Sequence, residues 1–82
     1  MVVYGIRFVD DFDSYLSLGL FEHKADALAL AKKTAEGYVR TWSKNSISRD
    51  SVKMEQLENG FKVTDGEEDY TMDILVQEIA VQ

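Results

Sequence analysis

The chain has 82 residues, 45% of them hydrophobic and 29% charged, with a formal net charge of −6 and with neither cysteine nor proline. This length accommodates one hydrophobic core, so residues 1–82 are expected to form a single domain, and the hydrophobic content excludes a disordered chain. The absence of cysteine excludes disulfide bonds, thiolate metal sites and cysteine nucleophiles, and it favours a cytoplasmic protein because small secreted domains usually depend on disulfides.

The first two predicted elements form a hairpin. Residues 2–9 alternate in a way that predicts a strand with one apolar face. That face comprises Val2, Tyr4, Ile6 and Phe8. Residues 10–14 are rich in aspartate, which is typical of turns. Leucines alternate with small residues over 16–20, which predicts a second strand antiparallel to the first.

A helix is predicted next. On a wheel of about 100° per residue, the apolar side chains between residues 27 and 42 fall within an arc of about 120°, with charged side chains opposite. The apolar stripe consists of Ala27, Leu28, Ala31, Ala35, Tyr38, Val39 and Trp42. Asp26 suits the positive start of a helix, and Lys44 suits its negative end. We expect the stripe to face a sheet that includes Ile6, Phe8, Leu18 and Ile74.

A second hairpin is predicted around Asn59-Gly60, which separates alternating runs at 52–57 and 61–63. Asparagine and glycine tolerate the positive φ of a type I′ turn, so this pair is expected to form the loop. The resulting register places four apolar side chains on one face. They are Val52, Met54, Phe61 and Val63.

A further turn is expected at 65–69, followed by a last strand at 70–81 that is apolar on both faces. One face carries Ile74, Val76 and Ala80, and the other carries Leu75, Ile79 and Val81. The predicted fold is therefore α+β, an antiparallel sheet with one helix packed on one face, in the order β-β-α-β-β-β. Because one helix covers one face, we expect a symmetric homodimer through the second face or through strand edges. The alternative is a strongly twisted sheet that buries part of both faces within one chain.

Charge is divided unevenly along the sequence. Residues 24–53 contain seven basic and three acidic side chains, for a net +4, whereas the rest of the chain has two basic side chains and twelve carboxylates, for −10. The basic part coincides with the predicted helix and the loop after it. We therefore expect a surface with two oppositely charged regions, which bears on partners rather than on fold.

Two acidic segments form the predicted partner-binding site. They contain Asp10, Asp11, Asp13, Asp65, Glu67, Glu68 and Asp69. If both hairpins point the same way, these carboxylates lie on one edge of the sheet and attract a basic partner. The alternative is that they only keep turns solvated and strand edges unpaired. The first segment lacks the glycine and glutamate spacing of a calcium loop, and the glycines lack phosphate-loop spacing, so no metal or cofactor is expected.

Other candidates have ordinary structural explanations. His23 is the only histidine, and one histidine without cysteine does not build a typical transition-metal site. Tyr38 and Trp42 are expected in the core, although partial exposure would make them an anchor for another protein. Basic side chains on the helix could contact nucleic-acid backbone, but a pI of about 4.6 disfavours this interpretation. They are Lys32, Lys33 and Arg40, together with Lys44 and Arg49, which follow the predicted helix.

The favoured function is a non-enzymatic protein-binding module, acting as an inhibitor or accessory factor of bacterial or phage origin. The sequence contains no nucleophile–base pair, no metal-ligand set and no phosphate loop. Its first residues lack the features of a signal peptide, and no apolar run approaches the roughly 20 residues that span a bilayer, so no membrane association is expected. Two alternatives remain: a nucleic-acid-associated regulator that uses the basic side of the helix, and a small enzyme subunit whose site is completed by a partner or by a second copy.

Overall fold

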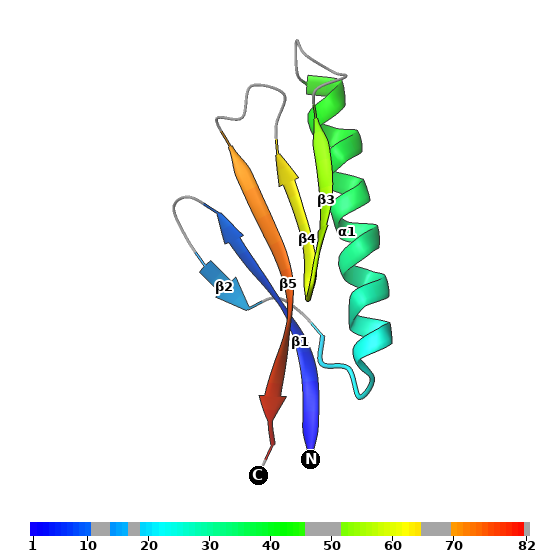
Figure 1. The fold of residues 1–82 in the computed structure, drawn as a ribbon, viewed down its shortest axis with the longest axis vertical. Coiled ribbons are helices and arrows are strands. Elements are labelled where there is room, and N and C mark those ends of the chain that lie inside the picture. The colour runs from blue at the N-terminus through cyan, green and yellow to red at the C-terminus, as the bar shows by residue number, and fades with distance from the viewer. Residues whose placement is uncertain (11–13, 17–18, 46–51, 65–69, 82) are drawn as a thin grey trace.

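The structure is a computed structural model that describes the backbone of residues 1–10, 14–16, 19–45, 52–64 and 70–81. Within these ranges the order of elements is β-β-α-β-β-β (Figure 1). The elements are β1 (Val2–Asp10), β2 (Ser14–Leu16), α1 (Lys24–Asn45), β3 (Lys53–Leu57), β4 (Gly60–Thr64) and β5 (Thr71–Ala80). The predicted α+β class, with one helix packed on one face of an antiparallel sheet, is confirmed.

The strands form one antiparallel sheet in the order β2-β1-β5-β4-β3. β1 and β5, from opposite ends of the sequence, lie side by side and pair from Val2↔Ala80 to Asp10↔Met72. Beyond this ladder, the amide of Val81 donates to the carbonyl oxygen of Met1 at 2.9 Å. β5 therefore has β1 on one side and β4 on the other, which is the central position that its two apolar faces favour.

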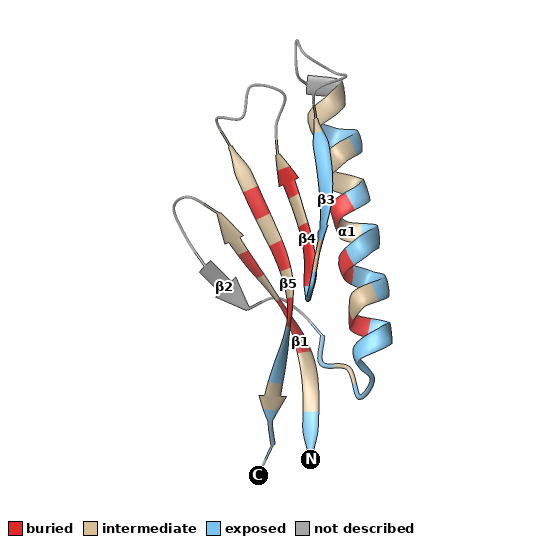
Figure 2. Cartoon of the chain, in the orientation of Figure 1, coloured by how far each residue is buried: buried red, intermediate tan, exposed pale blue. Residues whose placement is uncertain are grey.

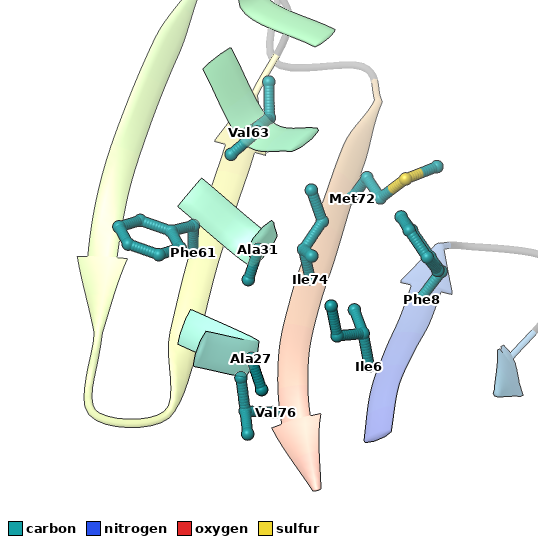
Figure 3. Packing of buried hydrophobic residues seen from close by; sticks show 10 residues of the cluster. Ile6, Phe8, Ala27, Ala31, Phe61, Val63, Met72, Ile74 and Val76 are labelled. Atoms are coloured by element: carbon teal, nitrogen blue, oxygen red, sulfur yellow. The ribbon is translucent and has the colours of Figure 1, made fainter. Parts of the chain in front are cut away.

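The hydrophobic core fills the layer between α1 and the sheet (Figure 2). Ala27, Ala31 and Ala35 recur at one-turn spacing and are fully buried, and their short side chains let the helix backbone come close to the strands. Figure 3 shows Ala27 and Ala31 of α1 among the strand side chains that complete this layer. They are Ile6, Phe8, Phe61, Val63, Met72, Ile74 and Val76. The rest of the predicted stripe packs around them partly buried, so the predicted orientation of the helix is confirmed; Leu18 lies outside the described residues.

The β3–β4 hairpin occurs where it was predicted, but its loop was assigned wrongly. Leu57 pairs with Gly60, so the loop residues are Glu58 and Asn59. Gly60 belongs to β4 and does not have a positive φ. A Cβ atom on Gly60 would collide with the carbonyl oxygen of Ile74, so close contact with β5 explains this glycine. The pairing differs from the predicted one by two residues, and the apolar faces are unchanged because side chains alternate with a period of two.

The second strand also differs from its prediction. β2 covers Ser14–Leu16 instead of 16–20 and pairs with the end of β1. Gly19 has a φ of +88°, which a continuing strand would not accommodate. After this bend, Phe21 exchanges two backbone hydrogen bonds with Tyr4, of 2.8 and 2.9 Å. Leu20, expected at the end of the strand, is 64% exposed.

No described helix or strand covers the sheet face opposite α1. Val3, Val9, Leu75 and Ile79 are half-buried on that face. Within the described ranges, no helix is both long enough and apolar enough to cross a membrane.

Candidate protein-binding site

The end of β1 and the start of β5 are joined by a side-chain hydrogen bond. The hydroxyl of Tyr70 donates to Oδ2 of Asp10 at 3.1 Å in a partly buried position. Asp10 is the last residue of β1, and Tyr70 directly precedes β5. The backbone pairing of Asp10 with Met72 brings the two side chains together, so this bond depends on the central strand pair.

Of the seven carboxylates predicted as a partner-binding site, the structure describes Asp10. The other six fall outside the described residues: Asp11, Asp13, Asp65, Glu67, Glu68 and Asp69. The strands that lead into the two acidic segments are described. β1 ends at Asp10 and β4 ends at Thr64, and both strands end at the same end of the sheet (Figure 1). The prediction that both acidic segments lie on one edge of the sheet requires these two strands to end at the same end.

Four aromatic rings connect α1 to this end of the sheet. Ring centroids are 6.4 Å apart for Phe8 and Tyr38, 5.8 Å for Tyr38 and Trp42, and 5.5 Å for Trp42 and Tyr70. All three contacts are edge-to-face, a geometry that contributes about 0.5–1.5 kcal/mol per pair beyond area burial. The series therefore holds Tyr70, and through it Asp10, against the last turns of α1.

A cavity of about 350 Å³ lies along α1 beside Tyr38 and Trp42. Thr34, Gly37 and Thr41 complete its lining, and Gly37 contributes no side chain to fill it. Both rings are half-buried, because they contact the core on one side and line this cavity on the other. The expectation that they belong to the core is therefore correct in part, and their exposed portions meet the condition for a protein anchor.

We refer to Asp10, Tyr38, Trp42 and Tyr70 as the aromatic–carboxylate site. A carboxylate accepts charge-assisted hydrogen bonds, and aromatic faces attract cations. The planar guanidinium of arginine satisfies both at once, because it donates hydrogen bonds in its plane and stacks on rings through its faces. Carboxylates and aromatic rings are thus the groups that recognise a basic side chain, and the cavity described above is lined by two of these rings, Tyr38 and Trp42.

His23 and the basic side chains of α1 were the other candidates from the sequence. His23 is exposed just before α1 begins. Lys32, Lys33 and Arg40 are exposed along α1 and are interrupted by the exposed carboxylate of Glu36. The side chain of Lys44 and all of Arg49 fall outside the described residues. Among the side chains that the structure describes, no group of three or more histidines and carboxylates is placed to hold a metal ion.

Sequence reasoning did not identify Tyr70 as a site residue. In the sequence it is the first apolar residue after an acidic segment, and this pattern indicates the start of a strand without indicating a binding site. Its role depends on contacts with Trp42 and Asp10, which are 28 and 60 positions away. Only the strand order, which places β5 beside β1 and beneath the end of α1, brings these three residues together.

Comparisons with known proteins found no match among family models, curated proteins or solved structures.

Proposed function

We propose that the protein is a non-enzymatic protein-binding module whose aromatic–carboxylate site takes a basic segment of another protein. The observation that carries this proposal is the arrangement of Trp42, Tyr70 and Asp10: two rings 5.5 Å apart, with the hydroxyl of the second bonded to a carboxylate. By occupying the basic segment of its partner, such a module acts as an inhibitor or accessory factor.

The charge of the chain supports a basic partner. The net charge is −6, and the acidic segments adjoin the site in the sequence. Asp11 and Asp13 follow Asp10, and residues 65–69, which contain four carboxylates, precede Tyr70. A concentration of negative charge accelerates association with a positively charged partner, whereas the half-buried aromatic rings supply the contacts that slow its release.

The single tryptophan makes this proposal directly measurable. Trp42 is the only tryptophan in the chain and belongs to the site, so its fluorescence reports on occupation without a label. We expect a short arginine-rich peptide to change this fluorescence in a saturable manner. The affinity should fall as salt is added, because screening weakens the attraction between exposed charges. An acidic peptide of the same length should have no effect.

A matched pair of variants separates the site from overall charge. Asp10→Asn removes the carboxylate charge while keeping an oxygen that can accept from Tyr70, and we expect it to weaken peptide binding about fivefold. Glu22→Gln removes one charge from an exposed position before α1 and should leave binding nearly unchanged. Equal losses of affinity in both variants would show that binding depends on net charge and not on the aromatic–carboxylate site.

A heparin column tests the alternative. Salt-sensitive retention of the protein on heparin, lost in a Lys32→Glu variant, would favour a function of the basic side of α1 instead.

A further inference from the structure

One edge of the sheet is incomplete along the second half of β5. β4 pairs with β5 from Thr64↔Thr71 to Gly60↔Leu75, and the last bond on this side is from the amide of Val76 to the carbonyl oxygen of Asn59, at 2.7 Å. β5 continues to Ala80 with β1 on its other side. From residue 77 to 80, no described strand lies on the β4 side, and the two central strands extend beyond β4 (Figure 1).

Two hydrogen bonds show which backbone groups of β5 face this edge. The amide of Val81 donates to Met1 beyond the β1 ladder, and the amide of Val76 donates toward β4. Because successive residues of a strand direct their backbone groups to opposite sides, Glu78 and Ala80 direct their amide and carbonyl groups to the incomplete edge. Within the described part of the chain, these groups have no hydrogen-bonding partner.

Two cavities flank this edge, one toward each face of the sheet. A cavity of about 510 Å³ includes Arg7, Leu57, Leu75 and Gln77, which belong to the face opposite α1. A smaller cavity of about 130 Å³ is lined on the helix side by residues that include Tyr4 and Lys24. A strand sends alternate side chains to opposite faces, so an added strand would direct its side chains into the two cavities in turn.

We propose that this edge, from Gln77 to Val81, binds the same edge of a second copy of the chain, so that two β5 strands pair antiparallel about a two-fold axis at Ile79. In this register Glu78 exchanges both backbone hydrogen bonds with Ala80 of the second copy. Ile79 faces its own counterpart. An isologous contact of this kind is the commonest route to a closed dimer.

The side chains at the edge favour a second copy as the occupant. Val81 is 43% exposed, and on the same face Ile79 is half-buried. In the proposed pairing, Val81 of the second copy lies beside Gln77, next to the cavity that Leu57 and Leu75 line. The apolar side chains at the end of β5 therefore approach Leu57 and Leu75 of the other copy, in a cavity whose lining is completed by polar residues that include Arg7 and Gln77. Each copy supplies both parts of this contact, as a two-fold contact requires.

Charge distinguishes this contact from the proposed binding of a basic partner. Each copy carries a net charge of −6, so two copies repel each other at long range. Added salt screens this repulsion, and we expect the dimer to become stronger as ionic strength rises. Binding of a basic segment should weaken under the same change. The contact uses no residue of the aromatic–carboxylate site, so either proposal can fail without the other.

Proline substitutions test the contact because they remove a backbone donor. The amide of Ala80 has no partner within the described chain, so Ala80→Pro removes only bonds between copies. Gln56→Pro is the matched control, at the edge strand β3. Leu57 pairs with Gly60 across the hairpin, and alternate residues direct their backbone groups to opposite sides, so the amide of Gln56 points away from β4 into solvent. Circular dichroism of both variants establishes that each is folded.

Sedimentation equilibrium of the full chain at moderate salt then decides the proposal. We expect the wild type and Gln56→Pro to show a reversible equilibrium between 9.3 kDa and twice that mass, and Ala80→Pro to raise the dissociation constant at least about tenfold. Ile79→Lys, which places like charges opposite each other, should act in the same direction. A wild type that stays at 9.3 kDa up to millimolar concentration would overturn the proposal, and so would a dimer that both Ala80→Pro and Ile79→Lys leave intact.

Discussion

The hydroxyl of Tyr70, just before β5, donates a hydrogen bond to Asp10 at the end of β1. This bond lies at the end of the sheet that is next to the last turns of α1. Tyr70 thereby contacts the helix through its ring and the sheet through its hydroxyl. A single side chain connects the predicted binding carboxylate to the only tryptophan of the chain.

Removing this hydroxyl should destabilise the domain modestly. Tyr70→Phe keeps the ring contact with Trp42 and leaves the partly buried carboxylate of Asp10 with one donor fewer. We expect a loss of about 1 kcal/mol in the free energy of unfolding, or roughly 4–8 °C in Tm for a domain of this size. A double-mutant cycle with Asp10→Ala, which removes the acceptor, should show that the two losses are not additive. Additive losses would mean that the pair does not interact in solution.

The alanine stripe of α1 offers a sharp test of how the helix is oriented. Ala35 is fully buried against the sheet, so Ala35→Asp places a charge in the core and should cost more than about 3 kcal/mol, measured by urea unfolding. Ala29→Asp, at an exposed position of the same helix, should cost less than about 1 kcal/mol. Similar unfolding midpoints for the two variants would show that α1 presents a different face to the sheet.

Two glycines should respond to alanine in opposite ways. A Cβ at Gly60 would collide with the backbone of β5, so Gly60→Ala should lower stability by several kcal/mol and weaken the β4–β5 pairing. Gly37 lies within α1, and a Cβ there would meet nothing nearer than Arg40 at 3.8 Å. Gly37→Ala should therefore raise stability by up to about 1 kcal/mol because alanine favours a helix. Thermal unfolding of both variants measures the difference in sign.

Neutralising the second acidic segment should affect association and spare the fold. Replacement of Asp65, Glu67, Glu68 and Asp69 by their amides changes the net charge from −6 to −2. We expect the same far-ultraviolet circular dichroism, together with a slower association of the arginine-rich peptide and a weaker dependence of that rate on salt. If stopped-flow traces of Trp42 fluorescence give the same association rate at low salt for both proteins, these carboxylates do not steer the partner.

The fold was largely predictable because each element has a strong local signal. The one-turn spacing of Ala27, Ala31 and Ala35 predicts the buried side of the helix, and alternation predicts the faces of β1 and β5. The loop of the second hairpin was not predictable from Asn59-Gly60, since a glycine can serve a positive φ or a close approach between strands, and only the position of Ile74 decides between them.

The site was less predictable than the fold. Asp10 was identified from composition, but its bond to Tyr70 depends on which strands become neighbours. The incomplete edge of β5 was also inaccessible to sequence patterns. It results from the difference in length between β5, with ten residues, and β4, with five, and from the point at which their pairing stops.

The central strand pair has a consequence for how the protein is made. β5 comes last in the sequence yet occupies the middle of the sheet, between the first strand and the second hairpin. During synthesis, β1 and α1 emerge without the strand that joins them, and the apolar face of α1 has only a partial surface to cover it. Contacts that span nearly the whole sequence close slowly. We therefore expect cooperative folding to begin only after β5 has left the ribosome, because until then neither β1 nor the second hairpin has the strand that lies between them.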